Sequence, residues 1–245
     1  MRKALVVGGA NGIGLSIATQ LAKREDYVKI YIVDKNKFID DFSNPKFESI
    51  LFDLTNEDYS IFDGFRDVDT LMITAGFGKL SFFKDVSEQY ITSSFSVNAV
   101  APVRIIHHFI GKLASKEDFR CGVMVSIAGF MSSPFFAVYG ATKAALKIFI
   151  ESVNVELEKG GSKNRILNVS PGSIKGTSFN NGKTDLSITA MLANDIITRL
   201  EAKDDLFIPQ YEEIFKNVLA RYQADFREEG RHSYDYKLQN GRVNQ

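Results

Sequence analysis

The sequence lacks the features that mark most secreted, membrane-spanning and nucleic-acid-binding proteins. Its 245 residues include one cysteine, Cys121, so no disulfide can form within the chain, which fits a reducing compartment. Lysine and arginine (30) balance aspartate and glutamate (30), so no charge excess favours nucleic acid or a membrane surface. The first apolar run, Ala4–Val7, is interrupted by glycines and is too short for a signal peptide. No run approaches the roughly 18 apolar residues of a membrane span. We therefore expect a cytoplasmic protein with no nucleic-acid or membrane partner.

The sequence also has little that could bind a metal. His107 and His108 are neighbours in a helical segment and lie far from the third histidine, His232. No Cys/His/Asp spacing typical of a metal site is present. We predict no metal, and the two adjacent histidines are weak candidates for a catalytic base.

Short apolar segments alternate with helical patterns along most of the chain. The predicted strands are Ala4–Val7, Val28–Val33, Glu48–Phe52, Thr70–Thr74, Val123–Ile127 and Ile166–Val169. Helical patterns cover 15–23, 86–97, 99–115 and 139–159. Apolar strands that alternate with helices indicate a parallel sheet covered on both faces. We predict an α/β fold, a Rossmann-like doubly wound sheet in three layers. Residues 1–245 are expected to form a single domain with a core over about 3–180.

A glycine-rich turn follows the first predicted strand. Gly8, Gly12 and Gly14 form G-x-x-x-G-x-G, with Asn11 and Ile13 between them. Glycine permits a tight strand-to-helix turn and close approach of a ligand to the backbone. The helix that follows would present free N–H groups to a pyrophosphate. The pattern favours a nucleotide site, and the alternative is a tight turn without a ligand.

Asp34 ends the second predicted strand, twenty residues after Gly14. At this spacing a carboxylate can accept hydrogen bonds from an adenosine ribose, and it repels a 2′-phosphate. We predict that NAD(H) is preferred over NADP(H). Lys35 complicates this prediction because a neighbouring ammonium could reach a phosphate. The alternative for Asp34 is a solvated carboxylate at a strand end.

Ser126, Tyr139 and Lys143 are the candidate catalytic residues. Tyr139 and Lys143 are four residues apart, so a helix places both side chains on one face. A cation beside a phenol favours the phenolate and makes the phenol a better acid–base group near neutral pH. Ser126 ends an apolar strand-like run, where its hydroxyl could hold a substrate oxygen. Alone, the Tyr/Lys pair is a weak signal, because this spacing occurs by chance in many helices.

Taken in order, these motifs resemble those of the short-chain dehydrogenase/reductase superfamily, in its shorter single-domain branch. The resemblance covers about residues 3–180. It also includes Asp53-Leu54, Thr74-Ala75-Gly76, Asn98 and Pro171-Gly172. It implies an oxidoreductase that transfers a hydride between a nicotinamide cofactor and an alcohol or carbonyl substrate.

The resemblance assigns a catalytic role to four residues. It makes Tyr139 the general acid or base, and Lys143 the residue that holds the nicotinamide ribose and lowers the pKa of Tyr139. Ser126 would bind the substrate oxygen. Asn98 would kink a helix and anchor a water of the proton relay, or simply cap the helix.

The resemblance also assigns cofactor contacts beyond the glycine turn. Asp53 would contact the adenine amino group, with Leu54 packed beside it. Ala75 and Gly76 would pass close to the adenosine ribose. The nicotinamide would be contacted by Pro171, Gly172 and Ile174.

Three positions depart from the family pattern. Thr74 stands where asparagine is usual before Ala-Gly, and it offers one donor instead of two. Val7 precedes the first glycine where threonine is usual. Thr177 lies one residue later than the common threonine after Pro-Gly, because Gly176 intervenes. The local hydrogen bonds of these positions therefore cannot be carried over from the family.

The segment over about 181–245 diverges from the family. We predict a helix over 187–203, a short seventh strand at Leu206–Pro209 and an amphipathic helix over Tyr211–Phe226. That last helix would pack over the sheet edge or form a homodimer. Residues 227–245 are polar and are expected to be poorly ordered.

The 20 phenylalanines suggest an apolar substrate. Several cluster near predicted site loops: Phe77, Phe82, Phe83, Phe130, Phe135, Phe136 and Phe179. Core packing is an equally good explanation for each of them. Two other functions stay open: a non-catalytic dinucleotide sensor, and a sugar-nucleotide dehydratase or epimerase with the same Tyr/Lys pair.

Overall fold

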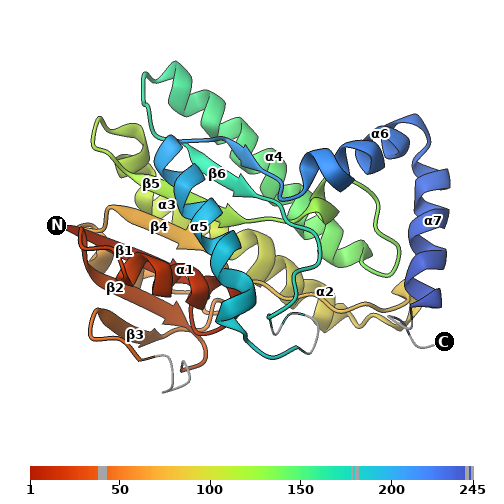
Figure 1. Cartoon of the computed structure of the whole chain (residues 1–245), viewed down its shortest axis with the longest axis horizontal. Helices are drawn as coiled ribbons and strands as arrows, with labels where there is room; N and C mark the ends of the chain where they lie inside the picture. Colours follow the sequence, from red (N-terminus) through yellow and green to blue (C-terminus); the bar gives the residue numbers. More distant parts are fainter. Residues whose placement is uncertain (38–42, 178, 180–181, 241–242, 244–245) are drawn as a thin grey trace.

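The apolar segments form one seven-stranded parallel sheet in the computed structural model, which describes residues 1–37, 43–177, 179, 182–240 and 243. The strand order is β3-β2-β1-β4-β5-β6-β7 (Figure 1). The strands are β1 (Arg2–Val7), β2 (Tyr27–Asp34), β3 (Phe47–Leu51), β4 (Thr70–Ile73), β5 (Arg120–Met124), β6 (Ile166–Val169) and β7 (Leu206–Phe207). Neighbouring strands pair in parallel throughout this order, so the predicted parallel sheet is confirmed.

Helices cover both faces of the sheet. They are α1 (Gly12–Ala22), α2 (Glu88–Phe95), α3 (Ala101–Ala114), α4 (Ala137–Lys159), α5 (Leu186–Ala202), α6 (Lys216–Ala224) and α7 (Phe226–Gln239). Successive strand residues point to opposite faces. Accordingly, Leu5 of β1 belongs to a core that α3 and α4 cover, whereas Val6 belongs to a core that α1 and α5 cover. The three-layer doubly wound fold is therefore confirmed.

The crevice for a ligand arises where the strand order reverses. From β1 the chain continues to β2 and β3 on one side of the sheet, and then to β4 and the later strands on the other. In such sheets a ligand binds at the carboxyl ends of the strands beside this reversal. Here those ends are Val7-Gly8 after β1 and Thr74-Ala75 after β4, which carry the predicted glycine turn and the Thr-Ala-Gly segment.

The C-terminal prediction is wrong in two respects. The predicted helix over Tyr211–Phe226 ends at Ala224, and a second helix, α7, occupies most of the segment expected to be poorly ordered. Asp225 separates them: its backbone is extended, and its side chain accepts hydrogen bonds from Arg227 N and Glu228 N. This is an N-cap with acidic residues in the first turn, a signal that the sequence contains. Residues 241–242 and 244–245 lie outside the described residues.

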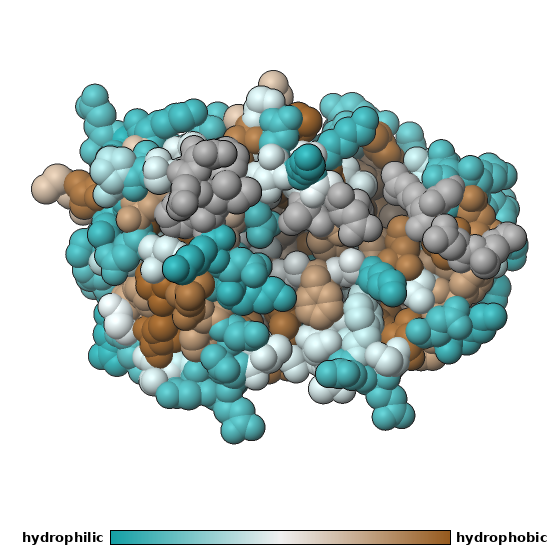
Figure 2. All heavy atoms as spheres, turned by 90° about the horizontal axis from the view of Figure 1, so that it is seen from below, coloured by the Kyte–Doolittle hydropathy of each residue, from teal (hydrophilic) through white to brown (hydrophobic). Residues whose placement is uncertain are grey.

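One face of the protein carries both hydrophilic and hydrophobic side chains. Figure 2 shows hydrophilic side chains mainly around the outline of this face, with hydrophobic side chains in separate patches. Within the described ranges, no helix is both long and apolar enough to cross a membrane. Cys121 lies inside β5 at 1% exposure, and burial raises the pKa of its thiol to about 12.

Candidate active site

The glycine turn at the end of β1 is shaped by its backbone. Gly8 has φ +83°, and a Cβ there would lie 2.6 Å from Ala75 Cα. Its N–H donates to Val33 O at 2.7 Å, which ties the turn to β2. Gly14 packs against the same turn, since a Cβ there would collide with Gly8 O. Glycine is therefore required at both positions for the strand and the helix to approach each other.

The N-terminus of α1 opens from this turn. Asn11 is its N-cap residue, and Gly12 has φ +53°. Gly12 N donates to Thr184 Oγ1 at 3.1 Å, and a Cβ at Gly12 would lie 3.5 Å from Thr177 Cβ. Ile13 is half-buried and packs against the core under the helix. The loop after β6 therefore packs onto the glycine turn. Sequence analysis did not assign Thr184 to the site.

Asp34 is fixed at the rim of the crevice. Its Oδ2 accepts from Ala10 N at 3.1 Å and its Oδ1 accepts from Asn36 N at 3.0 Å. Ala10 belongs to the glycine turn, so this carboxylate is held beside the turn at the end of β2. These hydrogen bonds keep it from swinging into solvent, and its ribose contact stays a prediction.

Asp53 lies beyond the end of β3 and is exposed. Its Oδ1 accepts from both the N–H and the hydroxyl of Thr55 at 2.8 Å. These bonds lower the pKa of Asp53, and the nearby Lys35 adds to this effect. Leu54 is half-buried against the core under β3. Lys35, which complicates the cofactor prediction, thus acts on Asp53.

Asn98 joins the segment after β4 to helix α4. It is fully buried in the π-helical turn Ser96–Val100 between α2 and α3. Its side chain bonds both polar groups of Phe77: Oδ1 accepts from the N–H at 2.9 Å, and Nδ2 donates to the carbonyl at 2.7 Å. Nδ2 also lies 3.3 Å from Thr142 Oγ1. The helix is thus distorted at Asn98, as the resemblance implied.

Ser126, Tyr139 and Lys143 converge at the same end of the sheet. All three are buried, at 8%, 8% and 2% exposure. Ser126 follows β5 and forms a hydrogen bond with Tyr139, which lies near the start of α4. Lys143 Nζ donates to Met124 O at 2.8 Å and lies 5.7 Å from the centre of the Tyr139 ring.

Asn98 also reaches this group. A Cβ at Gly76 would lie 3.3 Å from Asn98 Oδ1 and 3.4 Å from Lys143 Nζ. Ala75 N donates to Val7 O at 3.1 Å, at the start of the glycine turn. Gly76 is the next residue and therefore lies close to this turn. Asn98 and Lys143 therefore border Gly76, and Tyr139 borders Gly78 in the same segment after β4.

The predicted effect of Lys143 on Tyr139 is not found. Burial raises the pKa of Tyr139 to about 12, and the Ser126 hydrogen bond opposes this only in part. Burial also lowers the pKa of Lys143 to about 7, since a charged amine is poorly solvated there. Its amine donates to the Met124 carbonyl, and the pKa of Tyr139 is raised by burial and not lowered by this amine.

The predicted nicotinamide segment lies beside Ser126. Pro171 O accepts from Ile127 N at 3.1 Å. Gly172 faces the Phe215 ring, because a Cβ there would lie 2.7 Å from Phe215 Cζ. Ile174 O accepts from Thr177 Oγ1 at 3.1 Å, so this threonine stabilises its own loop.

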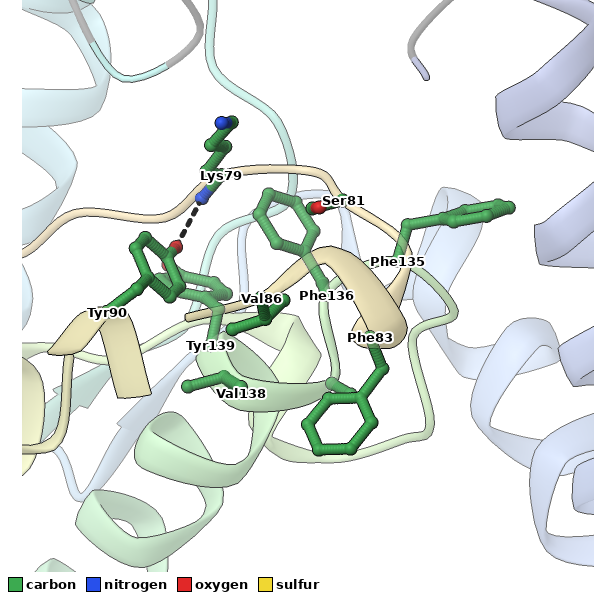
Figure 3. A pocket seen from close by; sticks show the side chains of 10 residues that line it. Lys79, Ser81, Phe83, Val86, Tyr90, Phe135, Phe136, Val138 and Tyr139 are labelled. Atoms are coloured by element: carbon green, nitrogen blue, oxygen red, sulfur yellow. Dashed lines mark hydrogen bonds between the residues drawn. The ribbon is translucent and has the colours of Figure 1, made fainter. Parts of the chain in front are cut away.

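An aromatic cavity borders Tyr139 (Figure 3). It is lined by Lys79, Ser81, Phe83, Val86, Tyr90, Phe135, Phe136, Ala137, Val138 and Tyr139. Its volume is about 10 Å³, which is room for about one water molecule. The Phe136 and Phe179 rings lie 5.0 and 5.3 Å from the Tyr139 ring, and Phe179 therefore helps to cover it.

Tyr90 was missed by sequence analysis. Its hydroxyl accepts from Lys79 N at 2.7 Å, shown as the dashed line in Figure 3. The charge of an ionised Tyr90 raises the pKa of Tyr139, so the two phenols are electrostatic neighbours. Tyr90 lies on α2, and only the fold brings this helix to the cavity.

The match to known proteins agrees with this arrangement. Residues 2–186 match the family model described as short chain dehydrogenase. The chain belongs to the short-chain dehydrogenase family. A family relative from Saccharomyces cerevisiae, named Uncharacterized oxidoreductase TDA5, is 25% identical over 208 residues. The match covers 81% of this chain and 63% of that relative, which is less than two thirds of its length.

Solved short-chain dehydrogenases share the fold. A short chain dehydrogenase from Burkholderia cenocepacia in complex with NADP has a TM-score of 0.76 and 21% identity, covering 91% of this chain and 97% of that one. A short chain dehydrogenase/reductase from Burkholderia phymatum in complex with NAD also has a TM-score of 0.76, at 15% identity, covering 93% and 95%. Structures of this fold are thus known with either dinucleotide.

This short-chain dehydrogenase departs from the family pattern at Thr74, and the structure gives that residue a function. Its hydroxyl donates toward Val7 O at 3.0 Å and Gly8 O at 2.9 Å. The single donor thus joins the end of β4 to the glycine turn. Within the described part of the chain, no cluster of three or more His, Cys, Asp or Glu side chains is suited to a metal.

Proposed function

We propose that this short-chain dehydrogenase interconverts an alcohol and a carbonyl compound, with NAD(H) as its preferred cofactor. The observation that carries the proposal is the convergence of Ser126, Tyr139 and Lys143, with the Lys143 amine beside Gly76. Reduction of a carbonyl needs a proton donor at its oxygen, and the Tyr139 hydroxyl is the buried phenol available there.

Tyr139 Oη is the group that moves the proton. In the reducing direction it donates to the substrate oxygen, and in the oxidising direction it accepts the alcohol proton. Ser126 Oγ orients that oxygen and stabilises negative charge as it develops. Because both side chains are 8% exposed, water is largely kept from the reacting oxygen.

Lys143 and Asn98 support this proton transfer. The raised pKa of Tyr139 and the lowered pKa of Lys143 share one main cause, burial. A bound polar ligand that accepts from Lys143 Nζ would favour its charged form, and this charge would then lower the pKa of Tyr139. Asn98 holds the backbone beside Lys143 through its two bonds to Phe77.

The arrangement of β1, α1 and β4 supports a dinucleotide site at the carboxyl ends of these strands. A nicotinamide cofactor, when bound, supplies or accepts the hydride. The turn Gly8–Gly14 and the first N–H groups of α1 would hold its pyrophosphate, and Ala75 and Gly76 would border its ribose. At the adenine end, Asp34 would accept from the ribose hydroxyls and Asp53 would contact the adenine. Pro171, Gly172 and Ile174 would border the nicotinamide.

The fixed carboxylate of Asp34 supports the preference for NAD(H). Both of its oxygens bond backbone N–H groups, so it cannot easily turn away from a 2′-phosphate. A carboxylate held at this rim favours a ribose with two hydroxyls.

The experiment is a panel of alcohols and ketones, apolar and aromatic ones included, incubated with purified protein and either NAD(H) or NADP(H). We expect a change in nicotinamide absorbance with at least one substrate. Cofactor binding without turnover across the panel would contradict the proposal and would favour a dinucleotide sensor. A sugar nucleotide converted without net oxidation would favour a dehydratase or epimerase.

Three further predictions accompany the proposal. We expect the chain to form a single domain and to act in the cytoplasm, and we propose a homodimer as one of the two arrangements open to the helix predicted over Tyr211–Phe226. Light scattering of the purified protein measures the last of these, and a monomer at all concentrations would contradict it.

A further inference from the structure

Helix α7 reaches back to the loop that precedes Tyr139. The helix lies outside residues 2–186, which match the family model. Its Lys237 is 8% exposed, and Nζ donates to Ser133 Oγ at 2.7 Å and to Pro134 O at 2.8 Å. About a hundred residues separate the partners in sequence, so these bonds attach the C-terminal segment to the loop before α4 (Figure 1).

The same helix also packs against Phe135. This residue has φ +67°, a left-handed conformation that a bulky side chain avoids. The Tyr234 ring of α7 lies 4.6 Å from the Phe135 ring, and Phe82 lies 5.0 Å away in an edge-on contact. Ser81 N donates to Phe135 O at 3.0 Å. A strained backbone persists only where its surroundings hold it, and α7 supplies part of that support.

The loop at 133–136 connects the contacts of α7 to Tyr139. Phe136 follows Phe135 directly, and its N–H donates to Ser133 O at 2.9 Å. Its ring lies 5.0 Å from the Tyr139 ring, and Lys237 Nζ lies 5.9 Å from its centre. In Figure 3 Phe135 points away from Tyr139, whereas Phe136 lies close to it. Fixing the backbone at 133–136 therefore fixes the aromatic ring that borders the proposed acid–base residue.

Helix α7 is itself held in place. Glu229 of α7, 9% exposed, accepts from Arg221 of α6 at 2.6 and 3.2 Å. At the other end of this pair of helices, Phe215 packs on Gly172, in the segment proposed to border the nicotinamide. Helix α7 and Phe215, the residue just before α6, thus contact two sides of the proposed active site.

We propose that Lys237 and Tyr234 are positioning residues that set which substrates this enzyme accepts. By holding the loop at 133–136, they keep the cavity beside Tyr139 small, at about 10 Å³, so the site takes compact apolar alcohols or carbonyls and rejects those that are bulky beside the reacting carbon. The inference rests on the proposed function, because it concerns the substrate class of the same site.

The test compares Lys237→Met with wild type on a compact and a bulky substrate. Lys237→Met keeps most of the side chain but removes its donors. We expect KM for the compact substrate to rise about tenfold, while kcat stays within about threefold, since Tyr139 and Ser126 remain in place. The preference for the compact over the bulky substrate should fall. Lys237→Arg should restore most of that preference, because arginine can also donate to both oxygens.

Arg231→Met is the matched control, because Arg231 is an exposed cation on the same helix. It should behave as wild type. Tyr234→Ala, at a position 37% exposed, tests the second contact and serves if Lys237→Met fails to fold. It should lower the same preference. Unchanged KM and preference in both variants of α7 would overturn the inference while leaving the proposed function intact.

Hydrogen exchange of the loop amides separates the two proposals further. Lys237→Met should speed exchange at 133–136 and leave the glycine turn unchanged. If wild type turns over no substrate, the proposed function fails. In that case, faster hydrogen exchange at 133–136 in Lys237→Met would still support Lys237 as the residue that positions this loop. Unchanged exchange in the variant would overturn the positioning role too.

Discussion

The glycine turn on one side of Tyr139 and the aromatic wall on the other are held by different kinds of contact. The turn is built from backbone: Gly8 and Gly14 allow strand and helix to meet, and Thr74 adds one hydroxyl. The wall is built from side chains, with Phe135 held between Phe82 and a tyrosine of α7. A site formed by backbone depends on a few residues that are close in sequence. A wall formed by side chains can be altered by substitutions that are distant in sequence. Substrate preference can therefore vary in this fold while cofactor binding is retained.

The largest effect is expected from Gly8→Ala, which tests the glycine turn. Its φ of +83° costs an alanine about 1–2 kcal/mol, and the added Cβ meets the Ala75 backbone, which cannot move freely. We expect the free energy of unfolding to fall by more than about 2 kcal/mol, with loss of cofactor binding. Denaturant unfolding and cofactor titration measure the two effects.

Gly161→Ala is the matched control for this variant. Gly161 has φ +80°, but no described residue lies within 4 Å of a Cβ there. It should show the conformational cost alone and leave cofactor binding unchanged. Equal losses in the two variants would mean that the close approach to Ala75 contributes nothing.

Gly78→Ala tests the contact between the segment after β4 and the ring of Tyr139. A Cβ at Gly78 would lie 2.8 Å from Tyr139 Cδ2 and 2.9 Å from Phe179 Cζ, so the phenol must shift. A misplaced catalytic group costs up to about 100-fold in rate, and we expect kcat/KM to fall by about that factor with little change in cofactor affinity. Gly64→Ala is the control, since the described part of the chain leaves open space there. Full activity in Gly78→Ala would show that the Tyr139 position is not critical.

Much of the cofactor side could be predicted from the sequence, because it depends on local pattern. Gly8 and Asp34 follow apolar strands at fixed spacing, and parallel strands bring their ends together. The wall could not be predicted in the same way, since the contact of Lys237 with Ser133 follows no local spacing. Helix α7 was missed even though Asp225 carries a recognisable cap. The burial that raises the pKa of Tyr139 depends on three-dimensional packing, which a spacing of four residues does not contain.

Asp34→Ala tests whether the cofactor side selects its nucleotide by charge. Removing the carboxylate should weaken NAD(H) binding and relax discrimination against NADP(H), with the affinity ratio falling about tenfold, equivalent to about 1.4 kcal/mol. Titration of both cofactors into both proteins measures this ratio. Tighter binding of NADP(H) than NAD(H) by wild type would overturn the assignment.

A separate prediction concerns the pH dependence of the stability of Lys143→Met. Burial lowers the pKa of Lys143 from 10.5 to about 7 in the folded protein. Between these values the unfolded state binds this proton and the folded state does not, so the stability that depends on Lys143 rises with pH and is lowest below about 7. We compare the unfolding free energies of wild type and Lys143→Met in the cofactor-free protein. The value for wild type minus that for the variant should increase as the pH rises from about 7 to 10.5.

Lys147→Met is the control for this titration. Lys147 lies one turn further along α4 and pairs with Glu151 near the surface. Its difference from wild type should change much less across the same window. A constant difference for Lys143→Met would show that the amine is not buried as described.

The most direct test of the proposed chemistry is kcat for Tyr139→Phe on an accepted substrate, with the cofactor dissociation constant measured on the same preparation. The variant keeps the ring that packs against Phe136 and removes only the hydroxyl. We predict a fall in kcat of at least about 100-fold, typical of a lost general acid or base, with cofactor affinity within about threefold of wild type. Turnover equal to wild type would contradict it.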